Sequence, residues 1–294
     1  MKERFIGTGV ALVTPFMENG AVDFSAVARV VDNIVDGGAD YIVVLGTTGE
    51  TPTLSTDERK ALIRFVRDRV GGRAGLVVGV GGNCTRDVVA TLKSWDLSGY
   101  DAILSVNPYY NKPNQEGLYQ HFKAVSEASP IPVILYNIPG RTGVNMLPET
   151  IARLAQECDN IIGVKEASGN LEQMERVRAL TSEDFLLISG DDGLTVEVIK
   201  RGGAGVISVL ANLYPAETSE IVRRALSGDI EGATALIERA EGVINALFEE
   251  GNPVGVKCAL ALKGVCRDTM RLPLVAGSES LAEKMKTLMS EYEK

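Results

Sequence analysis

Eight short and almost uninterrupted apolar runs recur along the chain, and they constrain its fold more than any other feature. The runs are rich in Val, Ile and Leu and lack a strict alternation of apolar and polar residues. This pattern is typical of strands that are buried on both faces. The runs are Thr8–Phe16, Tyr41–Gly46, Leu76–Val80, Ala102–Val106, Val133–Tyr136, Ile161–Val164, Phe185–Ile188 and Val206–Leu210.

The stretches between these runs carry helix signals. Apolar side chains recur at helical spacing behind Asp23, which is a typical N-terminal cap, and Ser55–Glu58 has the sequence of a capping box. Pro148 is suited to the first turn of a helix, and Gly71-Gly72 is suited to a helix end. The chain therefore alternates strand and helix, which predicts parallel strands joined by right-handed crossovers.

Eight such units predict an α/β fold, a (β/α)8 barrel, whose usual size is about 250 residues. An open doubly wound sheet is the alternative, but no GxGxxG motif follows the first strand. We expect the barrel to span residues 1–228 and a C-terminal helical extension to span residues 229–294, with no Pro- or Ser-rich linker between them. The expected helices of the extension are Ile230–Phe248, Pro253–Lys263 and Ser278–Tyr292, the last with Ser280–Glu283 as its capping box.

Composition narrows the class of function. The net charge of −9 disfavours nucleic acid and anionic membranes as partners, and no apolar stretch reaches the roughly 20 residues of a membrane span. The first residues lack the apolar core of a signal peptide. The four cysteines, Cys84, Cys158, Cys258 and Cys266, form no CxxC pair. We therefore expect a cytoplasmic protein with free thiols.

The chain contains one histidine, His121, and no GxSxG motif. A serine–histidine–aspartate triad and a histidine-rich metal site are therefore disfavoured. His121 lies in a stretch with helical character, where a structural role is the simpler interpretation. Acid–base chemistry in this protein must then fall to Tyr, Lys, Asp or Glu.

Active sites of (β/α)8 barrels lie at the C-terminal ends of the strands. Lys165 closes the sixth apolar run, and Gly163, on the same face as Lys165 and Ile161, is expected to leave space beneath it. Desolvation there favours the neutral amine, which is a Schiff-base nucleophile. Tyr136 ends the preceding run and is placed to move protons. The alternatives are a strand-end lysine that reaches solvent and a tyrosine that caps the barrel.

Three further polar side chains follow strand ends. Thr47 and Thr48 lie in a glycine-flanked turn that could hold a carboxylate, and Arg141 could clamp a second carboxylate with its planar guanidinium. A plain turn and a solvated surface arginine are the alternatives. The glycine-rich segment 202–205 precedes the eighth strand, so it belongs to the opposite face and is a poor phosphate site.

At these residues the chain resembles the pyruvate-dependent class I aldolase family, which includes the N-acetylneuraminate lyases, and the likeness covers essentially the whole chain. The motifs favour the members that use L-aspartate 4-semialdehyde over the sialate lyases and keto-sugar-acid aldolases. The matching segments are Gly9–Phe16 (GVALVTPF), Leu45–Glu50 (LGTTGE), Asn107–Phe122 (NPYYNKPNQEGLYQHF), Tyr136–Gly143 (YNIPGRTG), Gly163–Ser168 (GVKEAS) and Ser189–Asp192 (SGDD).

The resemblance implies a catalytic role for four side chains. Lys165 corresponds to the lysine that forms an imine with pyruvate, and Tyr136 to the proton donor and acceptor. Thr47 and Tyr110 correspond to the other members of a hydroxyl relay, in which the family takes the tyrosine from a neighbouring subunit.

The resemblance also implies substrate contacts and an assembly. Thr48 and the backbone of Ile207 would bind pyruvate, and Arg141 would bind the carboxylate of L-aspartate 4-semialdehyde. The implied reaction yields 4-hydroxy-tetrahydrodipicolinate for lysine and diaminopimelate synthesis and needs no metal or organic cofactor. The implied assembly is a homotetramer, built as a dimer of dimers.

Some family members bind lysine as an inhibitor at the tight dimer interface. Asn83, Asp87 and Tyr109 match that effector site, but Asp87 is shorter than the usual glutamate. Thr56 and Arg59 stand where sensitive members often carry histidine. A fixed positive charge on Arg59 would repel a cationic ligand, so we expect weak or absent inhibition by L-lysine. The alternative is that Arg59 pairs with an acid on its own helix.

Two other functions stay open on the sequence. One is a sister lyase that splits a hydroxylated sugar acid with the same lysine chemistry. The other is a catalytically silent barrel that serves as a binding or regulatory subunit. The presence of Thr47, Tyr110, Tyr136 and Lys165 together disfavours the silent barrel.

Overall fold

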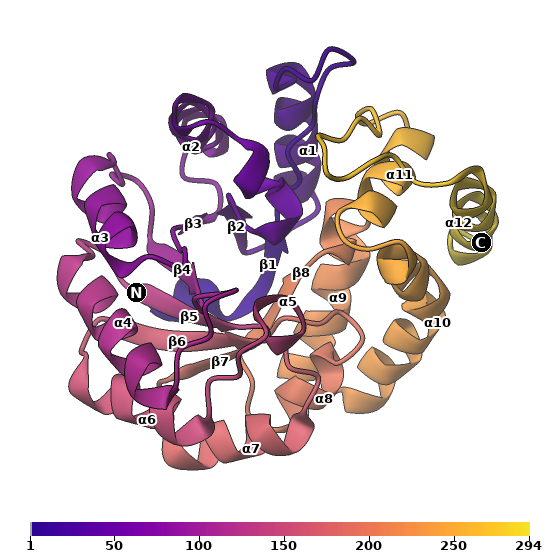
Figure 1. Cartoon of the computed structure of the whole chain (residues 1–294). Helices are drawn as coiled ribbons and strands as arrows, with labels where there is room; N and C mark the ends of the chain where they lie inside the picture. Colours follow the sequence, from indigo (N-terminus) through magenta and orange to yellow (C-terminus); the bar gives the residue numbers. More distant parts are fainter. Residues whose placement is uncertain (1) are drawn as a thin grey trace.

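In this computed structural model, which describes residues 2–294, eight parallel strands close into a barrel (Figure 1). Strand β1 pairs with both β2 and β8, so the sheet closes and the open doubly wound alternative is excluded. The predicted (β/α)8 fold is thus confirmed. The strands are β1 Gly7–Ala11, β2 Tyr41–Val44, β3 Gly75–Gly79, β4 Ala102–Val106, β5 Val133–Asn137, β6 Ile161–Glu166, β7 Leu186–Ser189 and β8 Gly205–Ser208.

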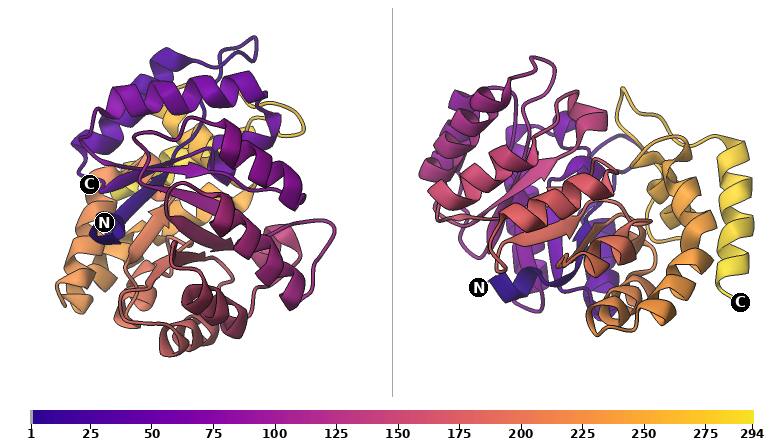
Figure 2. Two further views of the ribbon diagram at one scale, coloured as in Figure 1. Left: turned by 90° about the vertical axis from the view of Figure 1, so that its left-hand side faces the viewer. Right: turned by 90° about the horizontal axis from the view of Figure 1, so that it is seen from below.

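Helices surround the strands, and Figure 2 shows the last helix, α12, at one edge of the molecule. No helix within residues 2–294 has both the length and the apolar character of a membrane span. The helices are α1 Phe24–Asp36, α2 Thr56–Val70, α3 Thr85–Ser94, α4 Gln115–Ala128, α5 Pro139–Thr142, α6 Pro148–Glu157, α7 Leu171–Leu180, α8 Thr195–Lys200, α9 Pro215–Leu226, α10 Ile230–Glu249, α11 Val254–Leu262 and α12 Glu279–Tyr292.

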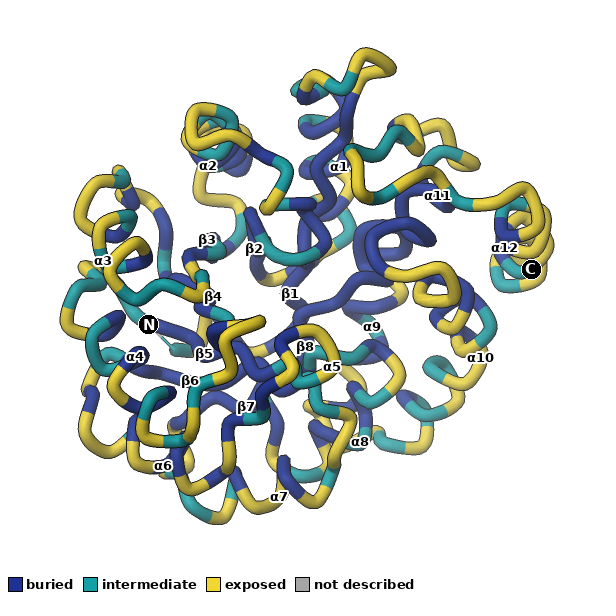
Figure 3. Tube along the Cα trace, viewed as in Figure 1, coloured by how far each residue is buried: buried dark blue, intermediate teal, exposed yellow. Residues whose placement is uncertain are grey.

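Both faces of the strands are buried, as the near-continuous apolar runs predict (Figure 3). One apolar core fills the barrel and includes Tyr41, Ile134 and Ile188. A second core lies between the strands and the helices and includes Val44 and Leu135. Most strands contribute alternate residues to the two cores, as the pleat of a strand requires.

Local helix signals are also confirmed. The Asp23 side chain accepts a hydrogen bond from the Ala26 amide at the start of α1. Ser55 and Glu58 form both hydrogen bonds of a capping box at the start of α2. Gly71 ends α2 in the left-handed region with a φ of 56°, a conformation that favours glycine.

Two differences from the expectation have a clear physical reason. The first strand ends at Ala11, because the Asn212 side chain accepts a hydrogen bond from the Val13 amide and donates one to the Ala11 carbonyl. A side chain thus replaces the neighbouring strand as the partner of this buried backbone. The final helix is capped by Ser278, whose hydroxyl accepts from the Leu281 amide, so the expected Ser280–Glu283 capping box is wrong.

The C-terminal helices pack on one side of the barrel. Helix α10 contacts α8 and α9 of the barrel as well as α11 and α12 (Figure 1). The connection from α10 to α11 passes over the C-terminal ends of the strands, where Phe248 and Asn252 reach the pocket described below.

Candidate active site

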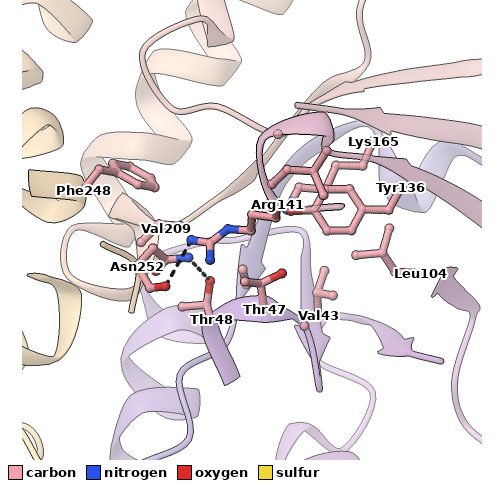
Figure 4. Close-up of a pocket in the computed structure, with 14 residues that line it drawn as sticks. Val43, Thr47, Thr48, Leu104, Tyr136, Arg141, Lys165, Val209, Phe248 and Asn252 are labelled. Carbon is pink, nitrogen blue, oxygen red and sulfur yellow. Dashed lines mark hydrogen bonds between the residues drawn. The ribbon is translucent and has the colours of Figure 1, made fainter. Parts of the chain in front are cut away.

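One pocket at the C-terminal ends of the strands brings together five of the side chains that the sequence singled out: Lys165, Tyr136, Thr47, Thr48 and Arg141 (Figure 4). The other residues that line it are Ala11, Val43, Gly46, Leu104, Ile138, Gly190, Val209, Phe248 and Asn252. The pocket thus combines apolar walls with several polar groups that converge on it, as is common for small-molecule sites.

Lys165 and Tyr136 occupy adjacent strands in direct register. Lys165 is 6% exposed, and its Nζ lies 4.5 Å from the centroid of the Tyr136 ring. A Cβ on Gly190 would lie 3.0 Å from Lys165 Cε, so glycine at this position makes room for the lysine side chain. The amine and the phenol ring therefore share one enclosed space.

The strand below Lys165 departs from the expected alternation. The register between β5 and β6 shifts after Val133, so that Ile161 joins the outer core and Ile162 the barrel core. Ile161 therefore does not share the face of Lys165, because a β-bulge interrupts the alternation. Gly163 leaves no empty space either: a Cβ there would lie 2.6 Å from Leu186 Cβ, so the glycine allows close approach of β7.

A buried polar network lies beside this pair of residues. Glu166, which follows Lys165 and is 0% exposed, accepts hydrogen bonds from Asn137 Nδ2 at 2.9 Å and Gln173 Nε2 at 3.0 Å. The side-chain oxygen of Asn137, Oδ1, accepts from Asn107 Nδ2 at 2.8 Å and from the Met146 amide at 2.9 Å. The residues next to Lys165 and Tyr136 are thus bonded to each other, which supports the register of the two strands.

A second buried carboxylate organises the end of β8. Asp192 accepts hydrogen bonds from the amides of Val209 and Leu210 at 3.0 and 3.1 Å. Burial raises the pKa of Asp192, while its hydrogen bonds oppose that shift. Ile207 lies inside the barrel core and is 1% exposed; Val209, two residues later, reaches the pocket wall.

Thr48 and Arg141 are joined by a residue that the sequence did not single out. Asn252 Nδ2 donates to Thr48 Oγ1 at 2.9 Å, and the Asn252 carbonyl accepts from Arg141 Nη2 at 3.1 Å (Figure 4). Phe248 also lines the pocket and was missed. The only local signal is the Gly251-Asn252-Pro253 sequence, which indicates a turn and says nothing about what the turn approaches.

The turn that carries Thr47 and Thr48 is tied to the same C-terminal region by a buried ion pair. Glu50, 2% exposed, pairs with Lys257, 0% exposed. Burial lowers the pKa of Lys257, and the Glu50 carboxylate opposes that shift. Glu50 has a φ of 51°, an uncommon conformation for a residue other than glycine.

Other residues that the resemblance named lie outside the pocket. Tyr110 is 86% exposed with a φ of 70°, and Tyr109 is also exposed. Asn83 Nδ2 donates to the Tyr109 carbonyl at 3.2 Å, which brings two of the three expected effector residues together. Asp87 is exposed and pairs with Arg86 at 3.3 Å.

Within residues 2–294, Arg59 does not pair with an acid of its own helix, which was the alternative for this residue. Its Nη2 donates to the Thr51 carbonyl at 2.9 Å, so its guanidinium lies against the turn after β2.

His121 is buried on α4, as expected for a structural histidine. Its Nδ1 lies 2.8 Å from Thr85 Oγ1 on α3, and burial lowers its pKa to about 4. Cys158, Cys258 and Cys266 are buried and Cys84 is partly exposed, all as free thiols. Within the described residues no three His, Cys, Asp or Glu side chains gather as a metal site.

Comparisons with known proteins identify the family. The chain matches the dihydrodipicolinate synthetase family over residues 4–292. It is 50% identical over 292 residues to the 4-hydroxy-tetrahydrodipicolinate synthase of Flavobacterium psychrophilum, an alignment covering 99% of this chain and 100% of that protein.

Two solved structures are also close. The crystal structure of dihydrodipicolinate synthase from Thermotoga maritima superimposes with a TM-score of 0.96 at 41% identity and 99% coverage of both chains. The lysine-bound synthase of Cyanidioschyzon merolae has a TM-score of 0.94 at 40% identity, over 98% of this chain and 99% of that one. With its barrel, its pocket and a family match that spans nearly its whole length, the chain belongs to the dihydrodipicolinate synthetase family.

Proposed function

We propose that this enzyme condenses pyruvate with L-aspartate 4-semialdehyde to give 4-hydroxy-tetrahydrodipicolinate, with Lys165 as the Schiff-base nucleophile. The observation that carries this proposal is the enclosed placement of Lys165 beside Tyr136, in a pocket that also holds Thr47, Thr48 and Arg141. The reaction serves the lysine and diaminopimelate pathway, as the names of the relatives imply.

The first half of the reaction activates pyruvate. The neutral amine of Lys165 attacks the ketone carbon, and the ketone oxygen leaves as water after accepting protons. Tyr136 and Thr47 are the hydroxyl groups in the pocket that can pass those protons. The resulting iminium withdraws electrons, so a methyl proton is lost and an enamine forms. Thr48 binds the pyruvate carboxylate in this proposal, and the backbone at Ile207 contacts pyruvate.

The second half forms two bonds. The enamine carbon attacks the aldehyde carbon of the semialdehyde, whose oxygen becomes a hydroxyl group. The amine of the same substrate then attacks the imine carbon, closes the ring and releases Lys165 as a free amine. Arg141 binds the carboxylate of the semialdehyde through its planar guanidinium. Every step uses side chains of the protein, and no metal or organic cofactor takes part.

Reductive trapping tests the nucleophile. Borohydride added with pyruvate should attach one reduced three-carbon adduct to the chain, and peptide mapping should place it on Lys165. Lys165→Ala should abolish trapping, whereas Lys263→Ala, a matched change on α11's C-terminal side, should leave it intact. An adduct on another lysine would contradict the assignment. Turnover of N-acetylneuraminate in place of L-aspartate 4-semialdehyde would favour the sister lyase.

Tyr110 completes the relay in this proposal, from a neighbouring subunit of a homotetramer. Its 86% exposure and left-handed backbone leave its side chain projecting from the surface of the single chain. Tyr110→Phe should fold normally and lose most turnover. Mixing it with Lys165→Ala under subunit exchange should restore activity, because one mixed site is intact. No recovery despite proven exchange, or a monomer at working concentration, would contradict sharing.

Asn83, Asp87 and Tyr109 line a lysine effector site in this proposal, and inhibition is weak or absent. The pairing of Asp87 with Arg86 and its short side chain leave little attraction for the ammonium groups of lysine. An assay at saturating pyruvate with increasing L-lysine decides the matter, and strong inhibition below millimolar lysine would contradict it.

We place the enzyme in the cytoplasm, where its four free thiols would stay reduced.

A further inference from the structure

The ion pair between Glu50 and Lys257 is the most deeply buried pair of opposite charges in the described residues, since both side chains are 0% exposed. Its members are separated by 207 residues, so it joins the turn after β2 to the C-terminal helices. Lys257 Nζ also donates to the Thr269 carbonyl at 2.9 Å and lies 4.2 Å from the centroid of the Phe16 ring. The second oxygen of Glu50 accepts from the Arg271 amide at 3.2 Å.

Both members lie close in sequence to residues that touch each other in the pocket. Glu50 follows Thr48 by two residues and connects two single-turn helical segments, Thr47–Gly49 and Thr51–Thr53. Lys257 lies in the first turn of α11, which begins directly after the Asn252-Pro253 turn. The ion pair and the Asn252–Thr48 hydrogen bond therefore connect the same two segments at two neighbouring points.

We propose that Glu50 and Lys257 are positioning residues that hold the Thr48 hydroxyl, through Asn252, in the geometry that binds the pyruvate carboxylate. This inference rests on the proposed function, in which Thr48 binds that carboxylate. The Asn252 carbonyl also accepts from Arg141, so the same link aligns the groups assigned to the two substrate carboxylates.

The bonding of the pair favours a positioning role over a role in stability alone. A buried ion pair loses much of its attraction to desolvation, and well-packed neutral residues of similar size are often equally stable. Directional bonds to fixed partners, in contrast, restrain a backbone. Here the carboxylate has bonds from two separate groups and the ammonium has two acceptors, so the turn is held in one orientation. The strained left-handed backbone of Glu50 needs such restraint.

The test uses the double variant Glu50→Gln/Lys257→Met, which removes both charges and keeps the side-chain lengths. Its matched control is Lys263→Met. Lys263 also lies in the C-terminal region, where its Nζ pairs with Glu293 at 3.0 Å and lies 4.1 Å from the centroid of the Tyr214 ring. Unlike the Glu50–Lys257 pair, it is remote from the residues that line the pocket. The measurements are the pyruvate concentration for half-maximal borohydride trapping, KM and kcat, and cooperative unfolding in denaturant.

We expect the double variant to unfold cooperatively, to reach full trapping because Lys165 is intact, and to need at least about tenfold more pyruvate for half-maximal trapping. KM for pyruvate should rise by a similar factor, and Lys263→Met should match the wild type. A folded double variant with the pyruvate dependence of the wild type overturns the proposal.

A second variant keeps the test decisive if the double variant does not fold. Lys257→Arg retains the charge but replaces a compact ammonium by a wide planar group, so it should raise the pyruvate requirement while unfolding cooperatively. An unchanged requirement in that folded variant overturns the proposal as well. Failure of the wild type to trap pyruvate would instead contradict the proposed function, so the two failures are distinguishable.

Discussion

Two buried carboxylates, Glu166 and Glu50, lie close in sequence to pocket residues, yet the protein satisfies them in opposite ways. Glu166 follows Lys165 and is held by neutral amide groups from β5 and α7. Glu50 follows Thr48 and is held by the charged Lys257 of α11, 207 residues away. One region of the site is therefore supported from within the barrel, and the other from the C-terminal helices.

The difference indicates that two parts of the pocket, each with its own assigned role, are supported by different elements of the fold. The side assigned to the nucleophile depends on strand register, which the barrel itself provides through contiguous strands. The side assigned to the substrate carboxylates depends on a turn after β2, which accepts a hydrogen bond from Thr14 and whose buried Glu50 takes its charged partner from another element. The C-terminal helices supply that element, and the following predictions test the division.

The largest effect is expected for Lys257→Ala. The variant leaves the Glu50 carboxylate buried without its cation, which should lower the free energy of unfolding by about 3–5 kcal/mol. Lys263→Ala, which removes a partly exposed ion pair, should cost no more than about 1 kcal/mol. Denaturant unfolding measures the loss of unfolding free energy in both variants. Equal losses would mean that the Glu50–Lys257 pair stabilises the protein no more than a partly exposed ion pair does.

Acid should lower the unfolding free energy of the protein through His121, which lies on α4 of the barrel. Burial lowers its pKa from 6.5 to about 4, so the folded state binds fewer protons than the unfolded state between these values. Stability is therefore complete above pH 6.5 and falls as the pH drops towards 4, by roughly 2–3 kcal/mol. His121→Gln should flatten this part of the curve in urea unfolding at a series of pH values. A slope as steep as that of the wild type would contradict the assignment.

A smaller effect is expected for Glu166→Gln. The new amide would place a donor against Asn137, Gln173 or the Ser168 amide, and Asn137 cannot turn over without losing its bonds to Asn107 and Met146. We expect a loss of about 1–3 kcal/mol in unfolding free energy and slower borohydride trapping at saturating pyruvate. The pyruvate concentration for half-maximal trapping should stay the same. A shift of that concentration would contradict the proposal that Glu166 supports only the side of the pocket assigned to the nucleophile.

The smallest effect concerns Glu58, which pairs with Arg271 at 2.9 Å and ties the C-terminal segment to the start of α2. The hydrogen bond from Arg271 lowers the pKa of Glu58 from 4.5 to about 2. A carboxyl whose pKa is lowered on folding adds stability above pH 4.5 and loses it as the pH falls towards 2. Glu58→Gln should reduce that loss, by less than about 2 kcal/mol because the pair is partly exposed. Acid unfolding monitored by circular dichroism would measure the change, and an identical acid midpoint would contradict it.

Much of this architecture follows from the sequence alone. The eight apolar runs predict eight buried strands because side chains on both faces of each strand are shielded, and Asp23, Ser55 and Gly71 mark helix ends through local hydrogen bonding and backbone freedom. Barrel geometry then places Lys165 and Tyr136 side by side, since both end neighbouring strands. These features depend on contacts between residues that are near in sequence or ordered by a regular repeat.

Tertiary structure alone decided the rest. The bulge that moves Ile161 to the outer core depends on how β6 packs against β5 and β7, which no local pattern reports. Asn252 enters the pocket, and Lys257 becomes the partner of Glu50, only because α10 and α11 fold back over the strand ends. A buried charge requires a partner, but the sequence around Glu50 does not indicate which distant lysine will pair with it. That choice depends on the packing of the whole chain.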